Sequence, residues 1–304
     1  MTVPVLTGVP VREGWDFGDF PYGLEPLTIP DAGTEPDGDG PCSRFAGLCS
    51  HLEHLSREGA PGAVEPVESS DRLYWFRWIT GHQVTFVLWQ LVARELALAE
   101  RGERDREAAL ASAALFTRGF SAMLLYTSST PIDVYHEVIR PSMFLQHRGF
   151  SGTWAPDFGP VRDLYRGKGL PDDDSPGVKA LRDEVGFYQR VHGGIAAKLV
   201  PSGRSLLQDA SGATETHHPD VLGAVYDNYF MTLRAPTSLP DVVAQLLRRL
   251  NAVALDVSVN GVDSVSDAED PPAELTSPEV RSCEAGFVGL LADVAACAAG
   301  SPAD

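Results

Sequence analysis

The stretch from Asp71 to Arg101 limits the fold of this chain most strongly. It contains no proline and one internal glycine, Gly81, and therefore predicts one long helix. At about 100° of rotation per residue, its bulky rings project into one arc of roughly 80°. These rings belong to Trp75, Trp78, His82, Phe86 and Trp89. Because such a stripe has to be buried, we expect a central helix that carries one imidazole into an apolar interior.

His82 alone is open to two interpretations. It can be a core histidine whose ring nitrogens bond backbone or hydroxyl groups. It can equally be an acid–base or hydrogen-bonding group that points into an apolar pocket. The aromatic stripe does not separate the two, so the partners of His82 have to come from elsewhere in the chain.

The rest of the chain also favours helices. Apolar residues recur at helical spacing in residues 43–58, and a second long helix is expected from about 104 to 126. Four further helix starts place a Ser or Thr cap close to a proline. They are Thr130-Pro131, Ser175-Pro176, Ser238-Leu239-Pro240-Asp241 and Ser277-Pro278. Residues 257–259 are the only strand candidate, and a weak one, so we predict an all-α helical bundle.

We expect a single helical domain over residues 1–304. Its parts are an irregular N-terminal arm (1–41), the core (42–260), and an acidic linker with a C-terminal helix (261–304). The arm is rich in proline and glycine and lacks a sustained period, which predicts irregular structure packed by its aromatic residues. Loop-rich inserts are expected at 149–160 and 203–219.

The charge balance restricts the partners. With 24 Lys and Arg against 42 Asp and Glu, the formal net charge is -18, so nucleic acids and anionic membranes would be repelled. The 4 cysteines are too few and too scattered for a disulfide scaffold or a CxxC metal site. Neither a signal peptide nor a charge-free run of membrane-spanning length is recognisable. We therefore expect a cytoplasmic protein that binds neither nucleic acid nor membrane.

Most of the other histidines favour a structural or surface role. His51 and His54 are spaced to clamp a metal, but no third ligand has matching spacing, which favours a surface pair. His217 and His218 are expected in a loop or a helix cap. His192 differs, because the other face of its expected helix is apolar.

His192 also has cations close by in sequence, namely Arg190, Lys198 and Arg204. As a lone helical histidine it would more often be structural. Together with His82, it suggests a flat acidic cofactor held between two imidazoles. Heme fits this pattern, with one imidazole on the iron, arginines at the propionates and a polar group over the open face.

Three segments resemble a known family. The run ITGHQVTFVLWQ is similar to the distal-histidine helix of tryptophan 2,3-dioxygenases, and TPIDVYHEVIRPS to their substrate-carboxylate helix, which ends in an arginine. The later GFSG is similar to the GFQS turn of that family. The run FYQRVHGGIAAKLVPSGRSLLQDASG resembles its proximal-histidine helix and the glycine- and serine-rich loop that follows.

Within this superfamily of histidine-ligated heme aromatic oxygenases, size and motifs resemble most the bacterial heme-dependent L-tyrosine hydroxylases of antibiotic pathways. The resemblance covers roughly residues 70–215. It implies His192 as axial iron ligand, His82 as the catalytic distal group and Arg140 as partner of the amino-acid carboxylate. The remaining site residues expected are Trp78, Phe86, Phe150 and Thr214 for substrate, and Arg190, Ser211 and Gly212 for the cofactor.

The resemblance also implies a reaction. L-Tyrosine would be hydroxylated next to its phenol oxygen to give L-DOPA, with hydrogen peroxide, or dioxygen and a reductant, as oxidant. The segment DASGAT replaces the dioxygenases' GTGGSSG, which disfavours tryptophan cleavage. A related methyltyrosine hydroxylase attaches heme through HxxxC, whereas His192 is followed by GGIA, so non-covalent heme b is expected. A homodimer is compatible with this organisation.

Two rival functions follow from the same residues. An indole-ring dioxygenase would insert two oxygen atoms into tryptophan rather than one into tyrosine. A non-enzymatic helical binding or adaptor protein would use the aromatic stripe only as core or as a partner groove, and it would be colourless.

Overall fold

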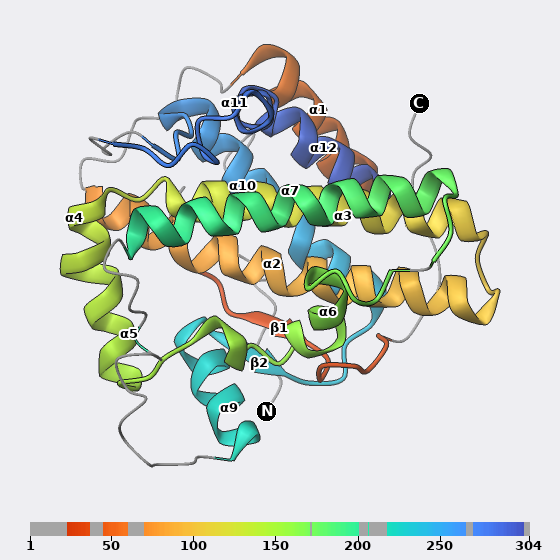
Figure 1. The fold of residues 1–304 in the computed structure, drawn as a ribbon, viewed down its shortest axis with the longest axis horizontal. Coiled ribbons are helices and arrows are strands. Elements are labelled where there is room, and N and C mark those ends of the chain that lie inside the picture. The colour runs from red at the N-terminus through yellow and green to blue at the C-terminus, as the bar shows by residue number, and fades with distance from the viewer. Residues whose placement is uncertain are drawn as a thin grey trace.

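The computed structural model describes residues 23–36, 45–59, 70–170, 172–200, 206, 218–265 and 270–300. Its secondary structure is almost entirely helical, which confirms the all-α prediction (Figure 1). The longer helices are α1 (Ala46–Glu58), α2 (Ser70–Arg101), α3 (Arg106–Ser128), α7 (Pro176–Leu199), α9 (Pro219–Tyr229), α10 (Leu239–Asn260) and α12 (Phe287–Ala298). The shorter elements are β1 (Leu27–Ile29), α4 (Ile132–Val134), the π-helix η2 (Tyr135–Ile139), α5 (Arg140–Gln146), the 3-10 helix η3 (Gly152–Trp154), α6 (Phe158–Tyr165), β2 (Thr232–Arg234) and α11 (Pro278–Ala285).

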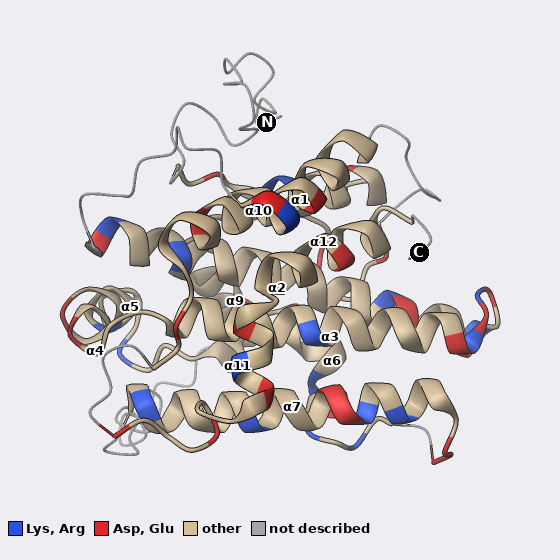
Figure 2. Cartoon of the chain, turned by 90° about the horizontal axis from the view of Figure 1, so that it is seen from above, with Lys and Arg blue, Asp and Glu red and all other residues tan. Residues whose placement is uncertain are grey.

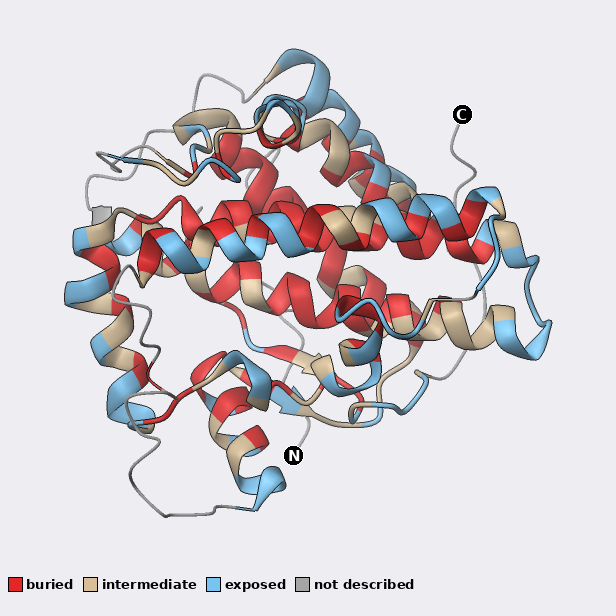
Figure 3. Cartoon of the chain, in the orientation of Figure 1, coloured by how far each residue is buried: buried red, intermediate tan, exposed pale blue. Residues whose placement is uncertain are grey.

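Helix α3 lies at the centre of the bundle. It packs against α2 on one side and α7 on the other, while α1, α10 and α12 form a second group that contacts α2 through α10 and α3 through α12 (Figure 2). Gly81 permits the close approach of α2 to α3, because a Cβ there would lie 2.5 Å from Thr127 Cγ2. Buried residues follow the inward faces of these helices (Figure 3). Although α3 is long and apolar enough to cross a membrane, most of it is buried inside the protein, as a central bundle helix would be.

Three of the four predicted caps are present. The side chains of Ser175, Ser238 and Ser277 accept hydrogen bonds from backbone N–H groups of the first turns of α7, α10 and α11. The prediction for Thr130 was wrong, because α4 is capped at Pro131 without a side-chain hydrogen bond. The Thr130 hydroxyl instead donates to the Thr127 carbonyl at 2.8 Å, and so belongs to the end of α3.

The one weak strand candidate is helical, and the short strands of the described residues lie elsewhere in the chain. Residues 257–259 lie within α10, whereas β1 and β2 form a two-stranded parallel sheet in which Leu27 faces Thr232. The described part of the N-terminal arm is therefore regular where it pairs with β2. Single three-residue segments give no periodic signal, and pairing between positions so far apart in the chain depends on the tertiary fold.

Only part of the two predicted inserts can be compared. Residues 149–160 contain η3 and the start of α6 rather than a plain loop. Of residues 203–219, the described positions are Leu206, His218 and Pro219, and His218 caps α9 as expected for a loop or cap residue.

Candidate active site

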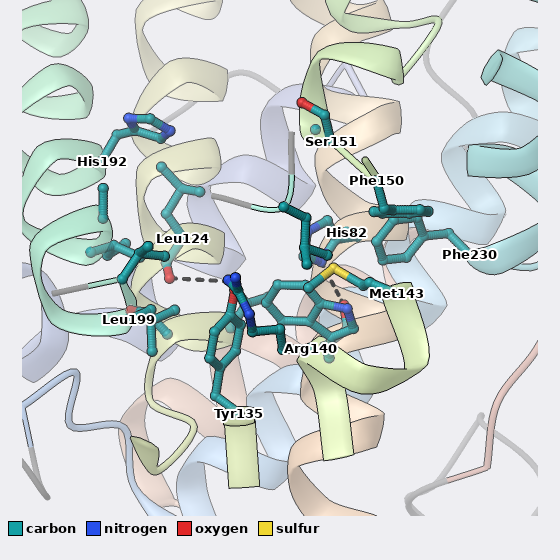
Figure 4. Close-up of a pocket in the computed structure, with 18 of the residues that line it drawn as sticks. His82, Leu124, Tyr135, Arg140, Met143, Phe150, Ser151, His192, Leu199 and Phe230 are labelled. Atoms are coloured by element: carbon teal, nitrogen blue, oxygen red, sulfur yellow. Dashed lines mark hydrogen bonds between the residues drawn. The ribbon is translucent and has the colours of Figure 1, made fainter. Parts of the chain in front are cut away.

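A cavity of about 300 Å³ lies where α2, α3, η2, α5, α7 and α9 meet (Figure 4). Five residues predicted for the site line it, namely Trp78, His82, Arg140, Phe150 and His192. The other lining residues are Leu124, Thr127, Ser128, Tyr135, Met143, Ser151, Gly152, Ile195, Ala196, Leu199, Val200, Leu206, Tyr226 and Phe230. An apolar cavity with a few polar groups is typical of a small-molecule site, and its volume is at the lower end of the usual range.

His82 enters the cavity from the middle of α2. Its Nδ1 lies 2.7 Å from the Trp78 carbonyl oxygen, one helical turn earlier. Because a carbonyl only accepts, Nδ1 carries the proton and Nε2 is left as the acceptor for a molecule in the cavity. Burial lowers the pKa of His82 to about 4, so the ring is neutral at physiological pH.

Two aromatic rings hold the His82 imidazole between them. The Phe230 ring is stacked on it, with centroids 4.3 Å apart and planes at 17°, and the Trp78 ring lies at 4.4 Å. Phe86, predicted to contact substrate, is buried behind His82 at 6.4 Å and does not line the cavity. Phe230 was missed by the sequence reasoning, although the aromatic run Tyr226-Asp227-Asn228-Tyr229-Phe230 was a signal that could have drawn attention to it.

The outer members of the aromatic stripe belong to the core. Trp75 meets the edge of the Tyr229 ring, and Trp89 packs against Phe120 and Phe158. Neither tryptophan lines the cavity, so they support the site only from behind.

His192 faces the cavity from α7, on the other side from His82 (Figure 4). The residue as a whole is exposed to solvent, while the protein around its ring desolvates the imidazole enough to lower its pKa below the ordinary value. A neutral imidazole offers a lone pair to a metal. The structure thus brings together the two histidines that the sequence placed 110 residues apart (192 minus 82).

Arg140 is positioned by a change in helix type. The peptide N–H of Arg140 donates to the Tyr135 carbonyl across a π turn, so these residues lie one above the other and both line the cavity. In an α-helix, residues five apart would point about 140° from each other. Pro141 explains the π turn, because its ring lacks an N–H and clashes with the carbonyl four residues earlier. The side chains also interact: burial raises the pKa of Tyr135, and a hydrogen bond with Arg140 opposes this rise.

Of the predicted propionate partners, the two that the structure describes, Arg190 and Lys198, do not line the cavity. Arg190 pairs with Glu279 of α11 and lies over the Phe187 ring, and it does not line the cavity. At 100° per residue, Arg190 and His192 point about 160° apart, so both cannot face the same group. Lys198 instead donates to the Ser128 and Thr130 carbonyls at the end of α3. Arg204, Ser211, Gly212 and Thr214 lie outside the described residues.

The residues present fit a flat, largely apolar cofactor with one imidazole ligand. Apolar side chains of α3 and α7 lie around His192, and two neutral histidines face one another across them. In the described ranges no cluster of three or more His, Cys, Asp and Glu side chains could hold a metal ion. No cysteine among the described residues lines the cavity. Heme held by His192 satisfies these conditions.

Fold and site together define a mainly helical protein with an apolar cavity between two neutral histidines. Residues 43–169 match the family model described as SfmD 3-methyl-L-tyrosine peroxygenase. This match supports a heme peroxygenase that acts on tyrosine-like substrates. It includes His82 and Arg140 but ends before α7, so it does not bear on His192. No curated protein sequence matches the chain.

Proposed function

We propose that the protein is a heme-dependent hydroxylase that converts L-tyrosine into L-DOPA with hydrogen peroxide, or with dioxygen and a reductant. The observation that carries this proposal is the pair of neutral imidazoles, His82 and His192, which face one cavity from α2 and α7 with Arg140 at its edge. The family match adds a tyrosine-like substrate and a peroxide oxidant.

His192 is the residue that would hold the cofactor. Within the part of the chain that the structure describes, its ring has no hydrogen-bond partner, so a nitrogen is available for iron. When bound, heme would supply a metal centre that activates the oxidant. The heme would be non-covalent heme b, because the described cysteines lie away from the cavity.

Arg140 would bind the carboxylate of the amino acid. A guanidinium can meet a carboxylate with two parallel hydrogen bonds, which fixes the direction of the substrate as well as its affinity. The side chains of Trp78, Tyr135, Met143 and Phe150 lie nearby and would enclose the aromatic ring. Such orientation decides which ring carbon meets the oxidant.

His82 would move the proton. Nε2 of the neutral ring would accept a proton from peroxide, or from the substrate phenol, and return it to the oxygen that leaves as water. In balance, one peroxide oxygen is inserted into a ring C–H bond next to the phenol, the O–O bond breaks, and the other oxygen leaves as water. The low pKa of His82 keeps Nε2 free of a proton before the oxidant arrives.

The test combines a spectrum with a product mass. The purified protein is expected to show a heme Soret band and to add one oxygen atom to L-tyrosine when peroxide is supplied. His192→Ala should lose heme or its normal ligation, while His54→Ala, at an exposed position of α1, should change neither. His82→Ala should keep heme and lose roughly 100-fold or more in turnover.

Several outcomes would contradict the proposal. A colourless protein would favour a binding or adaptor role, and two oxygen atoms added to tryptophan would favour an indole dioxygenase. An unchanged spectrum in His192→Ala would move the iron ligand to another histidine, with His217 and His218 examined first.

A further inference from the structure

A polar cluster lies directly behind the cavity, at the residue that follows His82. Gln83 is buried, and its Nε2 donates to the carbonyl oxygens of Glu25 at 3.0 Å and Phe230 at 2.9 Å. Its Oε1 accepts from Arg249 Nε at 2.8 Å. Gln83 thus uses both amide hydrogens and its oxygen to join α2, the chain before β1, the end of α9 and α10.

Arg249 makes this cluster rigid. Its side chain is 0% exposed, and its guanidinium donates to the carbonyls of Glu25, Pro26 and Gln245 as well as to Gln83. Burial lowers the pKa of Arg249 to about 10, which still leaves it charged at neutral pH. A buried cation surrounded by accepting oxygens resists rearrangement, because any lost contact leaves a charge poorly solvated.

The backbone just after Phe230 is strained. Met231 has a φ of 53°, a left-handed conformation that is unfavourable for a residue with a side chain. Hydrogen bonds hold the chain on both sides of this residue, since Leu27 N–H donates to the Met231 carbonyl at 3.0 Å and Gln83 donates to the Phe230 carbonyl. The sharp end of α9 therefore depends on contacts from outside that helix.

This backbone position determines where the Phe230 ring lies. The ring is buried and stacked on His82, while Trp78 contacts the imidazole at a tilt of 52°. The Trp78 carbonyl also accepts from Nδ1, so the imidazole is constrained by two rings and one hydrogen bond. If Phe230 moved away, the imidazole could rotate and water could reach it.

We propose that Gln83 and Phe230 are positioning residues for His82. Gln83 fixes the Phe230 carbonyl, the Phe230 ring holds the imidazole against Trp78, and His82 is thereby kept with Nε2 available to the cavity. The role in turnover rests on the proposed function, whereas the positioning of the imidazole does not. The titratable groups that share the cavity with His82 are Tyr135 on η2, Arg140 on α5, His192 on α7 and Tyr226 on α9.

The experiment compares Gln83→Met with Gln90→Met. Gln90 lies two turns further along α2 and also donates to a backbone carbonyl near β1, that of Pro30 at 3.2 Å, but it does not contact Phe230 or the cavity. Both variants lose a glutamine that ties α2 to the N-terminal segment. Only Gln83→Met releases Phe230.

The first readout is the reactivity of the His82 ring in the protein as purified, measured by diethyl pyrocarbonate labelling and peptide mass spectrometry. This reagent labels neutral imidazole. The ratio of labelling at about pH 5.5 to that at about pH 7.5 should be close to 1 in the wild type and in Gln90→Met. In Gln83→Met it should fall toward about 0.1, since an ordinary imidazole is mostly protonated at about pH 5.5.

The second readout is turnover. Gln83→Met should lower kcat by about tenfold or more, because proton transfer depends on the orientation of His82, and it should leave KM for L-tyrosine nearly unchanged. Equal labelling ratios in Gln83→Met and Gln90→Met would overturn the proposal. If the chain does not hydroxylate tyrosine, the labelling ratios still decide whether Gln83 positions His82.

A second variant covers the case in which Gln83→Met does not fold. Phe230→Leu removes the stacked ring and keeps the polar cluster, and Phe187→Leu is its control, because Phe187 is equally buried but packs under Arg118 away from the cavity. The low labelling ratio is expected in Phe230→Leu and not in Phe187→Leu. A wild-type ratio in Phe230→Leu would contradict the role of the ring.

Discussion

At the scale of single residues, the two histidines of the cavity differ in their surroundings. The Nδ1–H of His82 is committed to the Trp78 carbonyl, and two rings enclose the imidazole. His192 keeps accessible surface, and within the described ranges no side chain or carbonyl binds its ring. A ring held in one tautomer suits proton transfer, whereas an uncommitted ring suits metal ligation. The difference in surroundings supports a role in proton transfer for His82 and in metal ligation for His192.

The depressed pKa of His82 has a consequence for stability. A histidine with an unfolded pKa of 6.5 and a folded pKa of about 4 binds its proton more readily in the unfolded state. The free energy of unfolding should therefore fall as pH decreases from about 6.5 to about 4, by roughly 2 to 3 kcal/mol from this group. Urea unfolding of the wild type and of His82→Gln at about pH 7 and pH 4.5 would measure it.

Other groups also titrate between these pH values in the wild type and in His82→Gln. Glu95 and Asp227, for example, have pKa values raised by burial. The quantity to compare is therefore the stability that each protein loses on acidification. We expect the wild type to lose more stability than His82→Gln on acidification. The same loss in both proteins would contradict the depressed pKa.

Arg140 leads to a prediction about substrate recognition. Replacing it with Met should raise KM for L-tyrosine by about tenfold or more, because a charge-assisted hydrogen bond contributes roughly 1.5 to 3 kcal/mol. Tyramine, which has the ring but not the carboxylate, should bind the variant and the wild type alike. Steady-state kinetics with both substrates test this, and an equal loss for tyramine would remove Arg140 from the carboxylate role.

At the scale of elements, the sequence predicted those helices that carry their own signal. The apolar periodicity of α1, α2, α3 and α7 and three of the serine caps are local properties. The pairing of β1 with β2 depends on contacts between segments far apart in the chain, which a residue pattern does not display. Pro141 is visible in the sequence, but its effect on the helix type at Tyr135 was not predicted.

In the candidate site, too, local sequence signals were recognised and contacts that depend on the tertiary fold were not. His82 was noted because it interrupts an aromatic stripe, and His192 because the other face of its helix is apolar and cations lie nearby in sequence. Arg140 came from the family resemblance. Phe230 could not be assigned, since only the tertiary fold brings the end of α9 against α2. Arg190 pairs with Glu279 and does not line the cavity, for a reason present in the sequence, because residues two apart along a helix point to nearly opposite sides.

The π turn gives a prediction for Pro141. Pro141→Ala restores an N–H and removes the ring that clashes, which allows the segment to become a regular α-helix. Arg140 would then rotate away from Tyr135 and from the cavity. We expect unchanged or higher thermal stability together with a raised KM for L-tyrosine.

The matched control is Pro176→Ala. Pro176 begins α7, where its missing N–H would have no helical partner in any case, so KM should stay at the wild-type value. A wild-type KM in Pro141→Ala would show that the π turn does not position Arg140.

At the scale of the whole molecule, Arg234 joins segments that are far apart in the chain. It binds Asp157 at 2.7 Å and Asp227 at 2.7 Å, and it donates to the Pro30 carbonyl. Gln90 of α2 donates to the same Asp157 carboxylate at 2.8 Å. This cluster holds the strand region, α6 and α9 against α2, on the side of the molecule from which Phe230 reaches His82.

Arg234→Met should therefore affect both stability and the site. The variant leaves two largely buried carboxylates without their cation, which costs roughly 3 to 5 kcal/mol for a buried ion pair that loses one partner. Arg101→Met is the comparison, because Arg101 also ties α2 to the N-terminal segment, through Glu35, but both groups are exposed and water screens their interaction. The urea midpoint should drop clearly in Arg234→Met and little in Arg101→Met. Loss of the cluster also releases α9, so the His82 labelling ratio should fall in Arg234→Met and not in Arg101→Met. Equal urea midpoints in the two variants would show that the cluster does not hold the strand region, α6 and α9 against α2.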